Sequence, residues 1–152
     1  INFWLFSMGW FYLFPLPITG PVPVDIFCSA ISLILYDIIF YHLHRLFHNK
    51  FFYRFHAKHH EWRFPIPVSA LDCSVIEYWV LNLLPAFASL YIAGVSYYSS
   101  LLASIFFVSN AVLAHTDWHS LSSHSFHHLY RNVNYGTLGL MDKIYGTYFR
   151  LF

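Results

Sequence analysis

The chain has 152 residues, of which 58% are hydrophobic, 22% aromatic and only 10% charged. A soluble domain carries about 25% charged residues, so this composition excludes an ordinary soluble enzyme, a disordered segment and a nucleic-acid-binding domain. The net charge of +1 and the two cysteines also exclude a polyanion-binding surface and a disulfide scaffold.

Four apolar stretches, taken in chain order, predict four transmembrane helices in two hairpins. The first covers 1–14 and is followed by a turn rich in proline and glycine at 15–24. The second runs over about 25–49, with Asp25 as its expected N-cap, and exceeds the roughly 30 Å hydrocarbon core, so its histidine end should project into water. The third covers 75–93 and the fourth 97–114, with a short turn between them.

The basic residues predict the orientation of these helices. All eight lysines and arginines lie within 42–74 or beyond 115, and none lies in the two turns at 15–24 and 94–96. An even number of spans places both basic regions on one face, which the positive-inside rule makes cytoplasmic. We therefore expect one all-α integral membrane domain over 1–152, with a cytoplasmic histidine-rich helical cap. Three buried helices of a soluble protein are the alternative, but they would have almost no polar face.

The histidines are concentrated in two windows. All 11 lie within 42–60 or 115–128, on the predicted cytoplasmic side. Ten of them follow helical spacings that should place each set on one helix face, where its members can converge on a point. These sets are His44 and His48; His56, His59 and His60; His115 and His119; and His124, His127 and His128. His42 is the exception, because it points to the other side of its helix.

This number of imidazoles indicates metal binding. Crowded imidazoles would titrate and repel near neutral pH unless a metal kept them neutral. One zinc ion needs only three or four ligands, so eight to ten histidines suit two six-coordinate ions with room for a small ligand. A carboxylate-bridged di-iron site needs Glu-x-x-His pairs, which neither Glu61 nor Glu77 supplies. The sequence therefore predicts an all-histidine two-metal site, whose chemistry suits iron and dioxygen.

At these motifs the chain resembles the fatty acid hydroxylase and sterol desaturase superfamily of membrane di-iron oxygenases. The resemblance begins at Asp37, Tyr41, His44, Arg45 and His48 and continues with H-A-K-H-H at 56–60. It includes A-H-T-D-W-H at 114–119, H-S-F-H-H at 124–128 and Asn-Tyr-Gly at 134–136. It extends over 37–149, which is the motif-bearing core of the domain.

The resemblance implies a reaction and its participants. Two iron ions and dioxygen would hydroxylate or desaturate an unactivated C–H position of a lipid, either a sterol or a fatty-acyl lipid. Electrons would come from a separate donor such as cytochrome b5 or a reductase. The expected surroundings are a lipid bilayer, that of the endoplasmic reticulum or of another organelle, and no nucleic acid.

Three charged residues are expected beside the metal ligands. Arg45 lies next to a histidine box and is positioned to pair with Asp37 or Asp117. Carboxylates commonly hold the outer nitrogen of a metal-bound histidine, which would give these aspartates a positioning role.

Two other classes of function are compatible with parts of this sequence. A structural or accessory subunit of a larger membrane complex would keep this fold. Two features suggest this alternative: the small size of the chain, and Ser74, where many members of the superfamily have a histidine. Such a subunit would co-purify with its partners and form no oxygen-dependent lipid product. A zinc or copper transporter is less favoured, because the histidines lie at helix ends and not through the bilayer.

Overall fold

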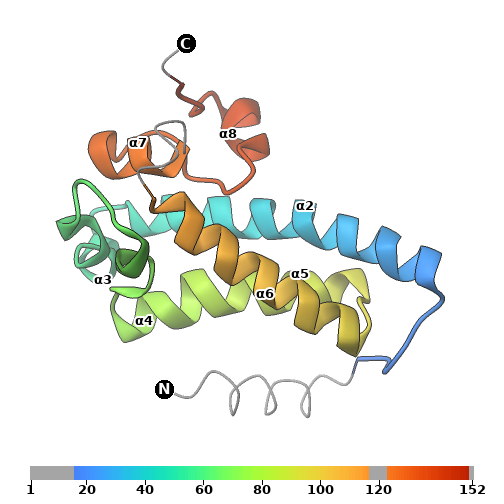
Figure 1. The fold of residues 1–152 in the computed structure, drawn as a ribbon. Coiled ribbons are helices and arrows are strands. Elements are labelled where there is room, and N and C mark those ends of the chain that lie inside the picture. Colours follow the sequence, from blue (N-terminus) through green and yellow to red (C-terminus); the bar gives the residue numbers. More distant parts are fainter. Residues whose placement is uncertain (1–15, 117–122, 151–152) are drawn as a thin grey trace.

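The computed structural model describes residues 16–116 and 123–150, and every regular element within those ranges is a helix (Figure 1). Three helices are long and apolar enough to cross a membrane: α2 (Val22–Phe47), the continuous helix Val75–Ala93 and α6 (Tyr97–Ala114). They correspond to the second, third and fourth predicted stretches. The first predicted stretch, 1–14, lies outside the described residues.

Shorter helices connect and follow the long ones. Between α2 and the next long helix lie α3 (Tyr53–His56), η1 (His59–Glu61) and η2 (Pro67–Leu71). The long helix itself consists of α4 (Val75–Glu77), the π-helical η3 (Tyr78–Leu83) and α5 (Leu84–Ala93). The π-helical turn ends two residues before Pro85, which has no N–H to donate within the helix and which crowds the preceding turn. After α6 come α7 (Ser123–Tyr130) and α8 (Leu140–Tyr145).

The start of α2 differs from the prediction. The N-cap is Pro21 and not Asp25, and Pro23 lies in the first turn, where its missing N–H costs nothing. Asp25 lies inside the first turn, and its carboxylate accepts hydrogen bonds from the backbone N–H and hydroxyl of Ser96 and from the hydroxyl of Ser99. These bonds tie the beginning of α2 to the beginning of α6.

The core between the long helices is small and aromatic. α2 packs mainly along α5, and a buried cluster joins Tyr36, Leu90, Val95 and Phe107. The rings of Tyr36 and Phe107 stack with their centroids 4.3 Å apart. α5 ends at Gly94, whose φ of +71° suits glycine, and the turn that follows leads directly into α6.

The outer faces of these helices are apolar and exposed. Phe27 on α2 is 66% exposed, Ile92 on α5 is 63% exposed and Leu102 on α6 is 70% exposed. In water such faces would be costly, whereas in a bilayer they contact acyl chains. The arrangement is therefore that of a membrane protein, not of helices buried in a soluble core.

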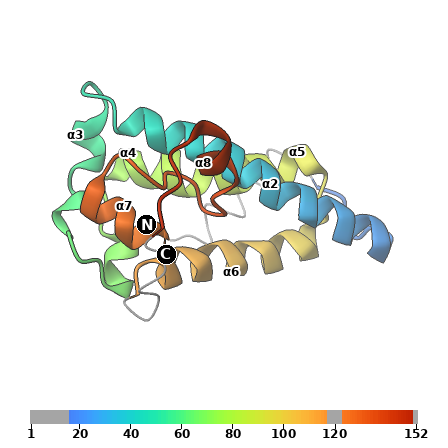
Figure 2. The same ribbon diagram turned by 90° about the horizontal axis from the view of Figure 1, so that it is seen from above.

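All histidine-bearing elements meet at one end of the helical bundle. Figures 1 and 2 show α3 and α7 beside the C-terminal ends of α2 and α6, and α8 against α2. Because α2 and α6 end there together, side chains that are far apart in the sequence lie side by side.

Candidate metal centre

Nine histidines gather into two adjacent groups, each with ligand nitrogens within 4.8 Å of one another. The five-histidine group contains His44, His48, His56, His60 and His127. The four-histidine group contains His59, His115, His124 and His128. Nine of the ten predicted ligands are thus brought together, and the tenth, His119, lies outside the described residues. His42 is exposed and belongs to neither group.

The groups do not follow the histidine boxes of the sequence. His44 and His48 share one group, as their spacing predicts, because one helical turn separates them. The prediction that each three-histidine set converges on one point is wrong. His59 separates from His60, and His127 separates from His128. Consecutive residues on a helix point about 100° apart, so each His-His pair faces two different groups.

Backbone carbonyls orient four of the rings. The Nδ1–H of His44 donates to the carbonyl of Tyr135 at 2.7 Å, and that of His127 donates to Val133 at 2.7 Å. His115 donates in the same way to Ala111 at 2.7 Å, and His128 donates to Trp62 at 2.8 Å. A carbonyl oxygen only accepts, so each of these Nδ1 atoms carries the proton and the Nε2 of the neutral ring has a free lone pair.

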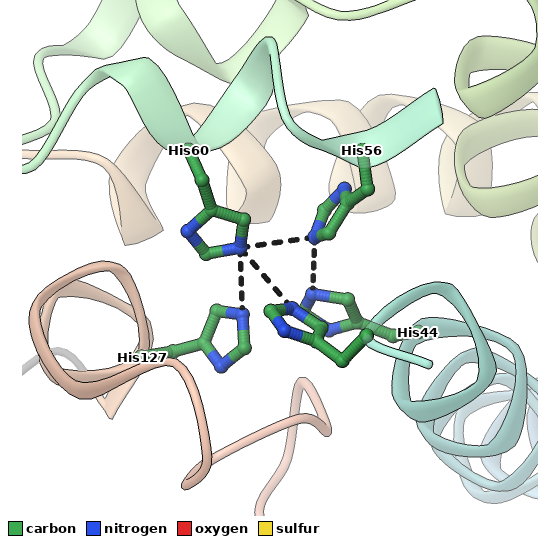
Figure 3. A group of neighbouring side chains, drawn as sticks. His44, His56, His60 and His127 are labelled. Carbon is green, nitrogen blue, oxygen red and sulfur yellow. Dashed lines mark hydrogen bonds between the residues drawn. The ribbon is translucent and has the colours of Figure 1, made fainter. Parts of the chain in front are cut away.

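The free nitrogens point at one another. Figure 3 shows the rings of His44, His56, His60 and His127 turned toward a common point. The Nε2 atoms of His44 and His56 are 3.0 Å apart, and the other close Nε2 pairs of the two groups lie at 3.0 to 3.2 Å. Two lone pairs at that distance repel unless a cation attracts both. If two nitrogens each lie about 2.1 Å from one metal ion and their bonds to the metal form a right angle, the nitrogens are about 3.0 Å apart. The observed spacing therefore fits a metal site in both groups.

Burial keeps the rings neutral and able to bind a metal. Burial, and then the charges of neighbouring histidines, lowers the pKa of His56, His59, His124 and His127 well below the ordinary value of 6.5. Burial also lowers the pKa of His48 to about 4 and that of His128 to about 3. The rings are therefore uncharged at pH 7, the state in which imidazole binds metals.

These lowered pKa values predict that the metal-free protein loses stability in acid. The unfolded chain takes up protons below about pH 6.5, whereas the folded rings do not, so the free energy of unfolding falls as the pH falls. Between pH 7.5 and 5.5 we expect a loss of about 1.4 kcal/mol for each such ring. Denaturant unfolding of chelator-treated protein measures it. A His127→Gln variant should show a shallower dependence, and stability that is flat or rising toward pH 5.5 would contradict the prediction.

Glu77 is a site residue that the sequence interpretation missed. Its side chain is buried, and its Oε1 accepts a hydrogen bond from His56 Nδ1 at 2.8 Å and lies 4.0 Å from His59 Nδ1. One carboxylate thus lies behind a histidine of each group. Ser74 positions it, since the serine hydroxyl caps α4 at the N–H of Glu77 and donates to the carbonyl of Phe55. The available signal was a carboxylate in an apolar helix, which is rare without a function.

Replacing Glu77 by glutamine is expected to weaken metal binding by about 10- to 100-fold, as is typical for a carboxylate behind a ligating histidine. The amide keeps the shape but loses the charge that stabilises the metal-bound ring. Metal titration of the purified protein measures the change. Glu61→Gln is the matched control, because the Glu61 side chain is exposed and forms no hydrogen bond or ion pair with a histidine of the described residues. Equal affinities of the two variants would contradict the prediction.

The charged residues expected near the ligands have other partners. Arg45 is exposed and donates to the Tyr41 hydroxyl at 3.0 Å, and its guanidinium lies over the Tyr145 ring. Asp37 is fully buried and accepts from the backbone N–H groups of Thr137, Leu138 and Met141. The expected Arg45–Asp37 pair is therefore not formed, because backbone donors surround the carboxylate. Asp117 lies outside the described residues.

The Asn-Tyr-Gly segment at 134–136 lies beside the five-histidine group and is itself fixed by hydrogen bonds. Asp142 accepts from the N–H groups of Tyr135 and Gly136, and Asn134 exchanges two hydrogen bonds with the backbone of Phe149. These bonds fix the Tyr135 carbonyl, which orients His44. Asp37 and Asp142 are thus structural supports of the centre.

A cavity of about 330 Å³ lies between the long helices and reaches both histidine groups. Five histidines line it: His44, His56, His59, His115 and His124. Its remaining walls come largely from α2, η3 and α6, with Phe40, Leu81 and Ala111 among the apolar residues. This volume is in the usual range for small-molecule sites.

The fold is that of a helical membrane protein, and its two histidine groups fit a metal site. The chain belongs to the fatty acid hydroxylase family, because the family model described as "Fatty acid hydroxylase" matches residues 29–147. The resemblance inferred from the histidine motifs is thereby confirmed, and it is a family that includes oxidoreductases.

Several curated proteins are similar to the chain. Fatty acid hydroxylase domain-containing protein 2 of Homo sapiens is 37% identical over 129 residues, covering 78% of this chain and 37% of the relative. Delta(7)-sterol 5(6)-desaturase of Leptosphaeria maculans is 29% identical over 122 residues, covering 74% of this chain and 34% of the relative. The chain thus spans little more than a third of the length of these relatives. No solved structure matches it.

Proposed function

We propose that the chain is the catalytic domain of a membrane oxygenase that holds two iron ions and hydroxylates or desaturates a lipid, either a sterol or a fatty-acyl lipid. The observation that carries this proposal is the position of the cavity. It connects two groups of buried histidine nitrogens with the space between membrane helices. The similarity to a sterol desaturase supports the same class of chemistry.

Different residues of the chain would bind the metals, orient the histidine rings and exclude water. The Nε2 atoms of the two groups would hold the metals, with His119 as a further proposed ligand. Bound iron would supply the activation of dioxygen and the removal of hydrogen from the C–H bond. The carbonyls of Tyr135 and Val133 keep the Nδ1 protons on His44 and His127, and Glu77 stabilises positive charge at His56. Apolar walls such as Phe40 and Leu81 exclude water from the reacting carbon.

The balance of the reaction requires an electron donor. Hydroxylation places one oxygen atom in the product and releases the other as water, which takes two electrons and two protons. Desaturation takes the same number and releases both oxygen atoms as water. We propose a separate donor such as cytochrome b5 or a reductase, reaching the histidine end from the cytoplasm. The basic residues near that end support this orientation, and the endoplasmic reticulum is the proposed membrane.

Elemental analysis of the protein purified from its own membrane, without added metal, tests the proposal first. Two irons per chain, together with an oxidised lipid that forms only with dioxygen, are the expected result. The proposal would be contradicted if the protein contained no metal or a single tightly held zinc, co-purified stoichiometrically with other subunits and formed no lipid product. That outcome would identify a structural subunit of a larger complex.

A further inference from the structure

Two asparagines in the long apolar helices face the same cavity. Asn82 lies in the π-helical turn η3, Asn110 lies in α6, and both line the cavity that reaches the histidines. Most of their neighbours in this wall are apolar, among them Phe40, Leu81 and Ala111. Amides at such positions require an explanation, because a polar group in an apolar membrane helix is costly unless it is hydrogen-bonded.

Helix-to-helix hydrogen bonding does not account for them. Asparagine in membrane helices commonly binds a neighbouring helix. The side-chain amide of Asn110, however, makes no hydrogen bond within residues 16–116 and 123–150. Asn82 has only a weak contact, from its Nδ2 to Cys73 Sγ at 4.0 Å. Both amides thus keep donors and acceptors available to a molecule in the cavity.

The two amides lie at similar depths below the metal centre. Asn110 precedes His115 by five residues, which is about 7.5 Å along the helix axis. Asn82 follows Glu77 by five residues in the helix Val75–Ala93, which forms another part of the cavity wall. π-Helical turns such as η3 are frequent at functional sites. A molecule in the cavity would therefore have the histidines at one end and a pair of amides on its flanks.

Beyond the amides lies a second cavity of about 240 Å³. It shares Tyr36, Asn82 and Ala111 with the first cavity, so the two are neighbours. Its further lining is mainly apolar and includes Leu83, Phe87 and Phe107. From the histidine end inward, the two cavities thus present the histidine groups, then a pair of amides and then an apolar space.

We propose that Asn82 and Asn110 bind a hydroxyl or carbonyl oxygen of the lipid substrate, so that this oxygen enters the cavity together with the carbon to be oxidised. The inference rests on the proposed function and narrows its substrate to lipids that carry such an oxygen near the reacting carbon. A hydroxyl matches the site well, because it donates to an amide oxygen and accepts from an amide N–H. The second cavity would receive apolar carbon atoms of the same molecule.

Binding of two matched probes tests this inference without any turnover. Native mass spectrometry of the detergent-solubilised protein would compare octadecan-1-ol with octadecane. We expect the unmodified protein to prefer the alcohol, and Asn110→Leu and Asn82→Leu each to lower alcohol affinity about tenfold while leaving alkane affinity unchanged. Ser89→Ala is the matched control, because Ser89 lies on α5, lines neither cavity and donates its hydroxyl to the Ala86 carbonyl.

Metal content and helical circular dichroism of every variant should stay unchanged, which separates a lost binding contact from a lost fold. The inference is overturned if the unmodified protein does not prefer the alcohol, or if both leucine variants retain that preference. Failure of the proposed function would look different: the unmodified protein would bind the alcohol selectively but contain no iron and oxidise no lipid.

Discussion

A His127→Ala variant is expected to lose the metal of the five-histidine group and all lipid oxidation while keeping its helical fold. His127 is fully buried, its Nδ1–H is held by the Val133 carbonyl, and its Nε2 lies 3.1 Å from that of His60. Alanine removes this nitrogen and leaves no side chain that can reach the same point. We expect metal affinity to fall by more than the roughly 100-fold typical of changes behind the ligands. Iron analysis and an oxygen-dependent product assay measure the two effects.

The same substitution at His59 tests whether two ions are bound. His59 belongs to the four-histidine group, with its Nε2 3.2 Å from that of His115 and 3.1 Å from that of His128. If each group holds its own ion, either variant should retain about half of the metal and no activity. If one ion is shared between the groups, each variant should lose all of it.

His42→Ala is the control for both variants. It removes the same side chain from the same end of the molecule, but His42 is exposed, and its ring contacts among the described residues are with Tyr41 and Tyr145. Metal content and activity should therefore equal those of the unmodified protein. A His127→Ala protein with full metal content, or a His42→Ala protein without metal, would disprove the ligand assignment.

An Asp37→Ala variant is expected to release the C-terminal segment 134–149 from α2 and to destabilise the protein by about 3–5 kcal/mol. The carboxylate accepts three backbone N–H groups at 2.7 to 3.1 Å and the hydroxyl of Thr137 at 3.2 Å. Alanine leaves these donors buried without a partner. Metal affinity should fall too, because the same segment carries the Tyr135 carbonyl that orients His44. Hydrogen exchange of 134–149 and denaturant unfolding measure the change.

Two further variants test whether the lost hydrogen bonds of the Asp37 carboxylate cause this destabilisation. Asp37→Asn keeps an oxygen for Thr137 and Leu138 but turns an amide toward the N–H of Met141, so its loss should be smaller. Gly136→Ala should resemble Asp37→Ala, because an added Cβ would lie 2.8 Å from Asp37 Oδ1 and 2.9 Å from Asp142 Oδ2. Unchanged exchange protection in Asp37→Ala would show that the segment is held by other contacts.

The sequence was sufficient to locate the long helices. Long runs of apolar residues predicted the stretches 75–93 and 97–114 with the observed bounds, because composition alone decides which segments lipid can surround. The start of α2 was misplaced by one turn. Asp25 has the side chain of an N-cap, but its carboxylate binds Ser96 and Ser99 across the bundle. A local capping rule does not include a partner that is about 70 residues away.

The site was predictable as a set of residues but not as an arrangement. Helical spacing singled out ten histidines, and nine of them meet in the structure. The spacing could not assign them to groups, since each His-His pair is divided between both. Glu77 was missed because its histidine partner, His56, is 21 residues away and lies on a separate helix.

The class of the protein could be predicted from the amino-acid sequence alone. Low charge, long apolar runs and spaced histidines are properties of single segments, and each follows from what one helix exposes to lipid or presents on one face. Which histidine nitrogens lie together, which carboxylates support them and where the cavity lies could be seen only once the helices were packed. Those properties depend on distances between segments far apart in the chain, which are set by how α2, α5 and α6 pack and by how the C-terminal segment binds Asp37.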